Sequence, residues 1–170
     1  GAGRKRMCEG VGTNTTDIAN SSSLMKEDEG AKCKANIGEY TKVQIGYDGI
    51  VFASRLETKG FEDLAPAHIY LAISDKSEIT NWKDVDPYFP DRSIKMFIPG
   101  TKHGTREVFD KKVMVAGCKK TGTHKYLMDS GLTKKEADKE CMKVRTDGVS
   151  VDIDGDYTET LASIASNKEG

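Results

Sequence analysis

The segment from Ile94 to Ala116 constrains the fold more than any other part of the sequence. It reads IKMFIPGTKHGTREVFDKKVMVA, which is typical of a short apolar strand, a turn and then a helix that opens on Gly104-Thr105-Arg106. The first N–H groups of a helix lack intrahelical acceptors and lie at the positive end of the peptide dipoles, so they bind anions well. Thr105 adds a hydroxyl, and Arg106 adds a forked cation suited to phosphate. The segment therefore predicts a site for a small tetrahedral oxyanion, with a plain helix cap as the alternative.

A nucleotide-binding P-loop is the nearest rival interpretation of this turn. That loop requires the pattern G-x-x-x-x-G-K-[ST]. Here the spacing from Gly100 to Gly104 is one residue short, and Thr105 rather than Lys follows the second glycine, Gly104. An enzyme would need a nucleophile with a positioned base or a metal site, and the pair of His103 with Asp110 is too weak a signal for either. The sequence thus predicts a binding protein that is not an enzyme and needs no cofactor.

Composition excludes several other classes. The chain has 170 residues, 36% hydrophobic and 31% charged, with a formal net charge of -1, as expected for a globular domain with its own core. Without a basic excess, we expect no nucleic-acid partner. No apolar run reaches about 18 residues, so no membrane span is expected. The chain begins at Gly1 without a Met or a recognisable signal peptide, which we interpret as a processed or trimmed chain.

The four cysteines fall into two pairs that are close in sequence, Cys8 with Cys33 and Cys118 with Cys141. Neither pair has C-x-x-C spacing, and the three histidines stand at no fixed offset that would complete a zinc site. Disulfides Cys8–Cys33 and Cys118–Cys141 are the preferred choice among the three possible connectivities, and they imply an oxidising compartment. Four reduced, buried thiols remain the alternative.

Strand-like and helix-like segments alternate along the chain, which predicts an α/β layer architecture. Ser23 is expected to cap a helix that ends near Asn36 or Gly38. Two further helices are expected to begin at Thr133, through a capping box with Glu136, and at Asp156. Three strands are also expected: a short one at Asp17-Ile18, an alternating one at Val43, Ile45 and Tyr47, and a buried one over Ile50 to Ala53. Two apolar helical stripes are expected as well. One surrounds Pro66 and consists of Phe61, Leu64, Ala65, Ile69 and Ala72, and the other consists of Tyr157, Leu161, Ile164 and Ala165.

The change of pattern after residue 42 suggests that the chain passes from one lobe to another, which divides it into residues 1–42 and 43–170.

The acidic run from Asp152 to Asp156 is a candidate calcium-binding loop. Its glycine, however, is not at the position where an EF-hand loop requires one. We interpret this run as a capped, solvated turn, where substitution of Asp152 should have no effect on anion binding.

Six short blocks of this sequence resemble, in the same order, blocks of the periplasmic phosphate-binding proteins of bacterial phosphate ABC transporters. The blocks are CEGVG from Cys8, DIANSS from Asp17, IGYDGIV from Ile45, NWKDVDP from Asn81, GTREVF from Gly104 and RTDG from Arg145. The resemblance implies two α/β lobes joined by hinge strands, with phosphate held between the lobes and a membrane permease as the docking partner. It also implies a periplasmic location and two disulfides, as in one branch of the family. This chain would then be a periplasmic-binding-protein-like lobe, a mixed sheet flanked by helices, with part of a first lobe.

The resemblance also implies a set of phosphate-binding residues: His103, Gly104, Thr105, Arg106, Ser22, Ser23 and the turn at Gly1, Ala2 and Gly3. His103 stands where the family has Ser, and Ser23 stands where relatives carry Asp or Arg. The chain is expected to begin after the first strand of the family fold and to stop before the strand that returns to the first lobe. A domain that keeps this fold for an interaction or sensory role, without phosphate, is the alternative.

Overall fold

The computed structural model of the chain describes residues 2–21, 23–47, 49–55 and 59–167. The chain forms two compact units, Gly1–Gly49 and Ile50–Gly170. The assignment of residues 1–42 and 43–170 to two lobes stays a prediction.

Unit 1 consists of two helices, α1 (Ala2–Met7) and α2 (Glu27–Ile37), joined by a disulfide between Cys8 and Cys33. Cys33 is fully buried. A second link runs from the Asn36 side chain, whose Nδ2 donates to the backbone oxygen of Cys8 at 3.1 Å. The disulfide prediction for this pair is therefore confirmed, and it fixes the two helices to each other.

Three expectations for unit 1 are wrong in detail. Ser23 does not cap α2, because that helix begins at Glu27 after the N-cap Lys26, whose N–H donates to the Glu29 carboxylate at 3.2 Å. The expected glycine turn is helical at Ala2 and Gly3, whereas Gly1 lies outside the described residues. No strand forms at Asp17-Ile18.

The expected strands over residues 43–53 are also absent from the described part of this segment. The apolar side chains that carried the alternating pattern are largely exposed: Val43 by 75%, Ile45 by 90%, Tyr47 by 97%. A β-strand requires a neighbouring strand to pair its N–H and C=O groups. None lies beside this segment among the described residues, so the β-type pattern produces no ladder.

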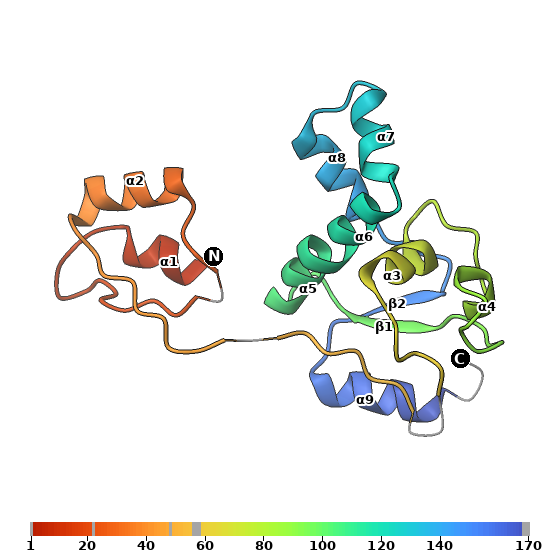
Figure 1. The fold of residues 1–170 in the computed structure, drawn as a ribbon. Helices are drawn as coiled ribbons and strands as arrows, with labels where there is room; N and C mark the ends of the chain where they lie inside the picture. The colour runs from red at the N-terminus through yellow and green to blue at the C-terminus, as the bar shows by residue number, and fades with distance from the viewer. Residues whose placement is uncertain (1, 22, 48, 56–58, 168–170) are drawn as a thin grey trace. The chain divides into compact units, whose positions relative to one another are not determined.

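Unit 2 is built on two parallel strands, β1 (Met96–Pro99) and β2 (Ser150–Ile153), paired from Met96 with Ser150 to Pro99 with Ile153. Helix α9 (Tyr157–Ser166) lies along one side of the strands, and α3 (Pro66–Ile73) lies on the other side (Figure 1). The α/β prediction is confirmed. The described sheet has these two strands, with isolated antiparallel bridges at Ser74–Val144 and Asn81–Ser93.

A long helical stretch leads away from β1. It runs through α5 (Gly104–Phe109), a π-helical turn η1 (Asp110–Met114) and α6 (Val115–Lys120), and is followed by α7 (Thr123–Asp129) and α8 (Lys134–Cys141). The second disulfide, Cys118–Cys141, ties α6 to α8, as predicted. The expected capping box is also present, since the Thr133 hydroxyl accepts from the Glu136 N–H and the Glu136 carboxylate accepts from the Thr133 N–H.

The core of unit 2 lies between α3, the long helical stretch and the strands. Pro66 occupies the first turn of α3 as predicted, although Phe61 and Leu64 precede the helix. Trp82 anchors the connector through α4 (Trp82–Val85). The largest buried side chains are Phe109, Ile69, Ile73, Ile98, Met114 and the two cysteines of the second disulfide. In contrast, Tyr157 and Leu161 of the expected α9 stripe remain exposed.

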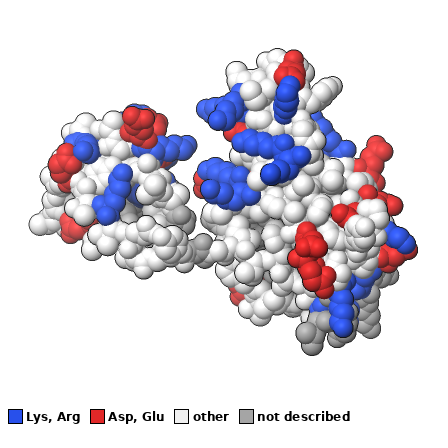
Figure 2. Space-filling view, in the orientation of Figure 1, with Lys and Arg blue, Asp and Glu red and all other residues white. Residues whose placement is uncertain are grey.

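Basic side chains, Lys and Arg, gather over the helical part of unit 2 that contains α6, α7 and α8 (Figure 2). Several of them pair with neighbouring carboxylates: Lys111 with Glu107, Lys119 with Asp138 and Lys125 with Asp129. Exposed ion pairs of this kind contribute little to stability. We interpret this surface as a solvated helical face.

Candidate functional site

The turn between β1 and α5 presents an open helix start. The His103 N–H donates to the Gly100 carbonyl at 3.1 Å, which closes the turn just before the helix begins at Gly104. A Cβ added at Gly104 would have nothing within 4 Å, so space lies beside this glycine. Helix geometry leaves the N–H groups of Gly104 and Thr105 without intrahelical acceptors. The helix start therefore offers donors next to open space, as an anion would require.

The turn is also packed tightly at its other end. A Cβ at Gly100 would lie 1.9 Å from Oδ1 of Asp154, so the Asp154 carboxylate packs directly against this glycine. The same carboxylate lies 3.5 Å from Nζ of Lys102. Only glycine allows the end of β1 and the segment after β2 to approach so closely.

Arg106 faces inward and is 7% exposed. Its Nε donates to Oδ1 of Asp110 at 2.8 Å, while Nη1 donates to Oδ1 of Asp152 at 2.8 Å and to the Pro99 carbonyl at 3.0 Å. The guanidinium thus joins the end of β1, the helix α5–η1 and β2. Asp152 is correspondingly not the isolated solvated carboxylate that the sequence suggested, because it is an ion-pair partner of Arg106.

Two carboxylates share this single cation, and the pKa values of Arg106 and Asp110 are both shifted. Burial opposes the charge of Arg106, but hydrogen bonds and charges from Asp110 and Asp152 outweigh it and raise the pKa of the guanidinium. Burial raises the pKa of Asp110 above its ordinary 3.8, the contacts with Arg106 lower it, and the nearby charge of Asp152 raises it further. The net result is a raised pKa of Asp110, chiefly because burial disfavours its charged form.

We predict a specific pH dependence of stability from Asp110. Because its folded-state pKa is raised, the unfolded chain releases this proton first, so the free energy of unfolding falls as pH rises from 3.8 through the raised pKa. The contribution of Asp110 to the free energy of unfolding is therefore largest at pH values below this range. Chemical denaturation of the parent and of Asp110→Asn across acid pH should show the parent losing stability relative to the variant as pH increases. Parallel profiles would contradict the assignment.

Thr105 and His103 both contact the segment after β2. The Thr105 hydroxyl lies 2.8 Å from the Tyr157 hydroxyl, and His103 Nε2 lies 3.3 Å from the carbonyl oxygen of Asp154. Since a carbonyl only accepts, Nε2 carries the proton in that contact. The His103 and Tyr157 rings are neighbours, with centroids 6.1 Å apart. Tyr157, 52 residues from Thr105 in sequence, is thus part of this site.

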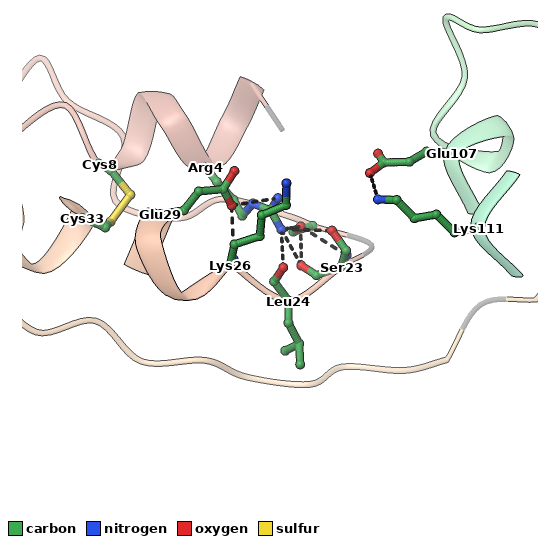
Figure 3. A network of polar contacts seen from close by, with 10 residues as sticks. Arg4, Cys8, Ser23, Leu24, Lys26, Glu29, Cys33, Glu107 and Lys111 are labelled. Atoms are coloured by element: carbon green, nitrogen blue, oxygen red, sulfur yellow. Dashed lines mark hydrogen bonds and ion pairs between the residues drawn. A yellow bond between two sulfur atoms is a disulfide. The ribbon is translucent and has the colours of Figure 1, made fainter. Parts of the chain in front are cut away.

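The second predicted set of ligands lies in unit 1. Ser22 is outside the described residues. Ser23 is exposed and lies in a network of polar contacts around Arg4, which reaches Ser23 and Leu24 on one side and Glu29 on the other (Figure 3). The structure therefore brings His103, Gly104, Thr105 and Arg106 together in unit 2 and places Ser23 beside a guanidinium in unit 1.

Other features of the described residues offer weaker candidates. A shallow pocket of about 230 Å³ is lined by Gly60, Glu62, Asp63, Asp86, Tyr88 and Phe89. Its three carboxylates make it unsuitable for an anion. In the described ranges, no three His, Cys, Asp or Glu side chains converge as metal ligands would. No described helix combines the length and the apolar character that crossing a membrane requires.

His68 and His124 have structural partners. His68 Nδ1 accepts from the Ala65 N–H at 3.2 Å, and its ring packs edge-on against Phe89. His124 is buried, with Nε2 2.9 Å from Oδ1 of Asp138. Neither histidine lies at the start of α5.

Comparison with known proteins identifies the superfamily to which this chain belongs. The PBP superfamily domain matches residues 1–170, so the chain belongs to the PBP superfamily. It is 29% identical over 105 residues to the phosphate-binding protein PstS of Staphylococcus saprophyticus, covering 62% of this chain and 32% of that protein. It is 29% identical over 114 residues to PstS of Staphylococcus haemolyticus, covering 67% and 34%.

A third relative has a different name. Protein SphX of Synechocystis is 30% identical over 116 residues, covering 67% of this chain and 33% of that protein. The matched regions correspond to about a third of the length of these curated relatives. No solved structure gives a significant match to the chain.

Proposed function

We propose that this chain binds inorganic phosphate for uptake by an ABC transporter, and that it acts as a binding protein without catalysis. Gly104 and Thr105 supply backbone N–H groups and a hydroxyl, and His103 and the segment carrying Ser22 and Ser23 supply further donors. The observation that carries the proposal is the open helix start at Gly104 in a chain related to proteins named for phosphate binding. A tetrahedral oxyanion is the ligand that such donors fit.

In this proposal, Arg106 positions other donors rather than binding the anion itself. Its cation is neutralised by Asp110 and Asp152, and its bond to the Pro99 carbonyl fixes the turn that leads to the helix start. We propose that Arg106 orients the N–H groups of Gly104 and Thr105 and offsets the negative charge that Asp110 and Asp152 place near them. The Tyr157 hydroxyl similarly holds the Thr105 side chain.

Gly104→Ala provides a direct test of the binding position. The added methyl group meets no atom of the protein, so we expect the free energy of unfolding to stay the same or rise slightly, since Ala favours helices more than Gly. If phosphate occupies the space beside Gly104, the methyl group should lower its affinity by about tenfold or more, as measured by calorimetric titration. Parent-like affinity would move the ligand away from this position.

The two alternatives predict different measurements. An interaction or sensory domain that has lost the ligand would show no heat of phosphate binding and no change in the His103 ring signals. An enzyme acting on phosphorylated substrates would release phosphate from a phosphomonoester. We expect binding without turnover.

The remaining parts of the proposal follow from the same relationship. We propose that the protein acts outside the cytoplasm, in the periplasm, where both disulfides are stable. We further propose that an ABC transporter permease is its macromolecular partner and that phosphate is held between two lobes. Disruption of phosphate uptake in cells that carry the Thr105→Val variant would support this role.

A further inference from the structure

Arg4 is the centre of the polar contacts in unit 1 (Figure 3). Its Nη1 lies within hydrogen-bonding distance of four oxygens from one short segment: Ser21 Oγ at 2.9 Å, Ser23 O at 2.6 Å, Ser23 Oγ at 3.0 Å and Leu24 O at 3.1 Å. Ser21, Ser23 and Leu24 are all exposed and lie outside helices and strands. Nη1 of Arg4 therefore contacts the oxygens of Ser21, Ser23 and Leu24 at the same time.

The other side of the guanidinium is anchored to α2. Nη2 of Arg4 lies 3.5 Å from Oε2 of Glu29, and the same carboxylate accepts the N–H of Lys26 at the start of that helix. The Arg4 side chain is only 15% exposed. Because the Cys8–Cys33 disulfide joins α1 to α2, Arg4 projects from a fixed base.

We infer that Arg4 is the positioning residue that holds the Ser23 hydroxyl ready to bind phosphate. This inference rests on the proposed function. The Ser23 oxygen accepts a hydrogen bond from Arg4, which leaves the hydroxyl hydrogen free to be donated to an anion. The adjacent cation also polarises the hydroxyl and makes it a stronger donor.

Apart from the bonds of Arg4, the described polar contacts of Ser21 and Ser23 are with each other. Within the segment, the Ser21 hydroxyl donates to the Ser23 carbonyl at 2.8 Å, and the Ser23 N–H donates to Ser21 Oγ at 3.3 Å. These exposed bonds compete with water, whereas charge-assisted bonds from a largely buried guanidinium are stronger. Loss of the guanidinium should therefore free Ser21, Ser23 and Leu24 to move.

The test compares Arg4→Gln with Arg6→Gln in the full chain. Both variants remove one positive charge from α1, but Arg6 is exposed and outside this network. Backbone order parameters from NMR report the mobility of Ser21, Ser23 and Leu24 without any ligand. Calorimetric titration with inorganic phosphate reports the affinity. Arg4→Lys is the rescue variant, because the Lys ammonium can donate to the oxygens that surround Nη1.

We expect Arg4→Gln to lower the order parameters of the three residues and to weaken phosphate binding by about tenfold or more. Arg4→Lys should restore part of both, and Arg6→Gln should leave both unchanged. Parent-like order parameters in Arg4→Gln would overturn the inference, and so would an equal loss of affinity in Arg4→Gln and Arg6→Gln. If the parent itself bound no phosphate, the proposed function would fail, while the order parameters would still decide whether Arg4 holds the segment.

Discussion

Replacement of Gly117 by Ala is expected to lower the free energy of unfolding of unit 2 by about 3 kcal/mol or more. Gly117 lies in α6 where this helix crosses α3, and a Cβ there would lie 2.2 Å from the Pro66 carbonyl oxygen and 2.6 Å from Cβ of Tyr70. Both neighbours are rigid parts of α3. The methyl group can fit only if the two helices separate, which would open the core between them.

Urea denaturation followed by tryptophan fluorescence measures this effect in the correct unit. Trp82 is the single tryptophan and is buried in the core of unit 2. Gly104→Ala is the matched control, because it adds the same methyl group to the same helical stretch in open space. A denaturation midpoint of Gly117→Ala equal to that of Gly104→Ala would contradict the close packing of α3 and α6.

Local signals in the sequence predicted much of unit 2. The capping boxes and caps at Thr133 and Asp156, the first-turn Pro66 and the strand before Gly104 each depend on neighbouring residues, and each is present. The two disulfides also join the cysteines that are close in sequence. Interactions between near neighbours are those that a sequence pattern expresses best.

The wrong predictions for the strands and for the apolar stripe of α9 share one physical cause, which is dependence on distant partners. Val43, Ile45 and Tyr47 have a strand-like pattern, but strand formation depends on a neighbouring strand, and none lies beside them in the described residues. Tyr157 and Leu161 have a helical apolar stripe, yet both remain exposed in α9. A pattern indicates which face is suited to burial without specifying what covers it.

The candidate site illustrates the same limit. The start of α5 could be predicted because Gly104, Thr105 and Arg106 are adjacent. The pairing of Arg106 with Asp152 and of Thr105 with Tyr157 joins residues 46 and 52 positions apart. No local pattern encodes these pairs, since the parallel pairing of β1 with β2 creates them. Asp152 was therefore interpreted as a solvated turn residue, and Tyr157 as an apolar one.

Removal of the Arg106 side chain is expected to have the second large effect. In Arg106→Ala, Asp110 and Asp152 lose their shared cation and the Pro99 carbonyl loses its donor. Removing one partner of a buried ion pair is costly, and because Asp152 is about half exposed, we expect a loss of about 2–3 kcal/mol. Phosphate affinity should fall by roughly ten- to a hundredfold, because two carboxylates are left near the site without their cation and the geometry of the helix start is lost.

Arg106→Lys separates these two contributions. Lysine keeps the positive charge but cannot reproduce the fork that bonds Asp110, Asp152 and the Pro99 carbonyl together. We therefore expect intermediate stability and an affinity closer to that of the parent than Arg106→Ala shows. Calorimetry well below the unfolding midpoint measures affinity in folded protein, and denaturation measures stability. If Arg106→Ala remained folded and bound phosphate as tightly as the parent, neither Arg106 nor the turn that it supports would belong to the phosphate site, and the ligand would have to bind elsewhere in the chain.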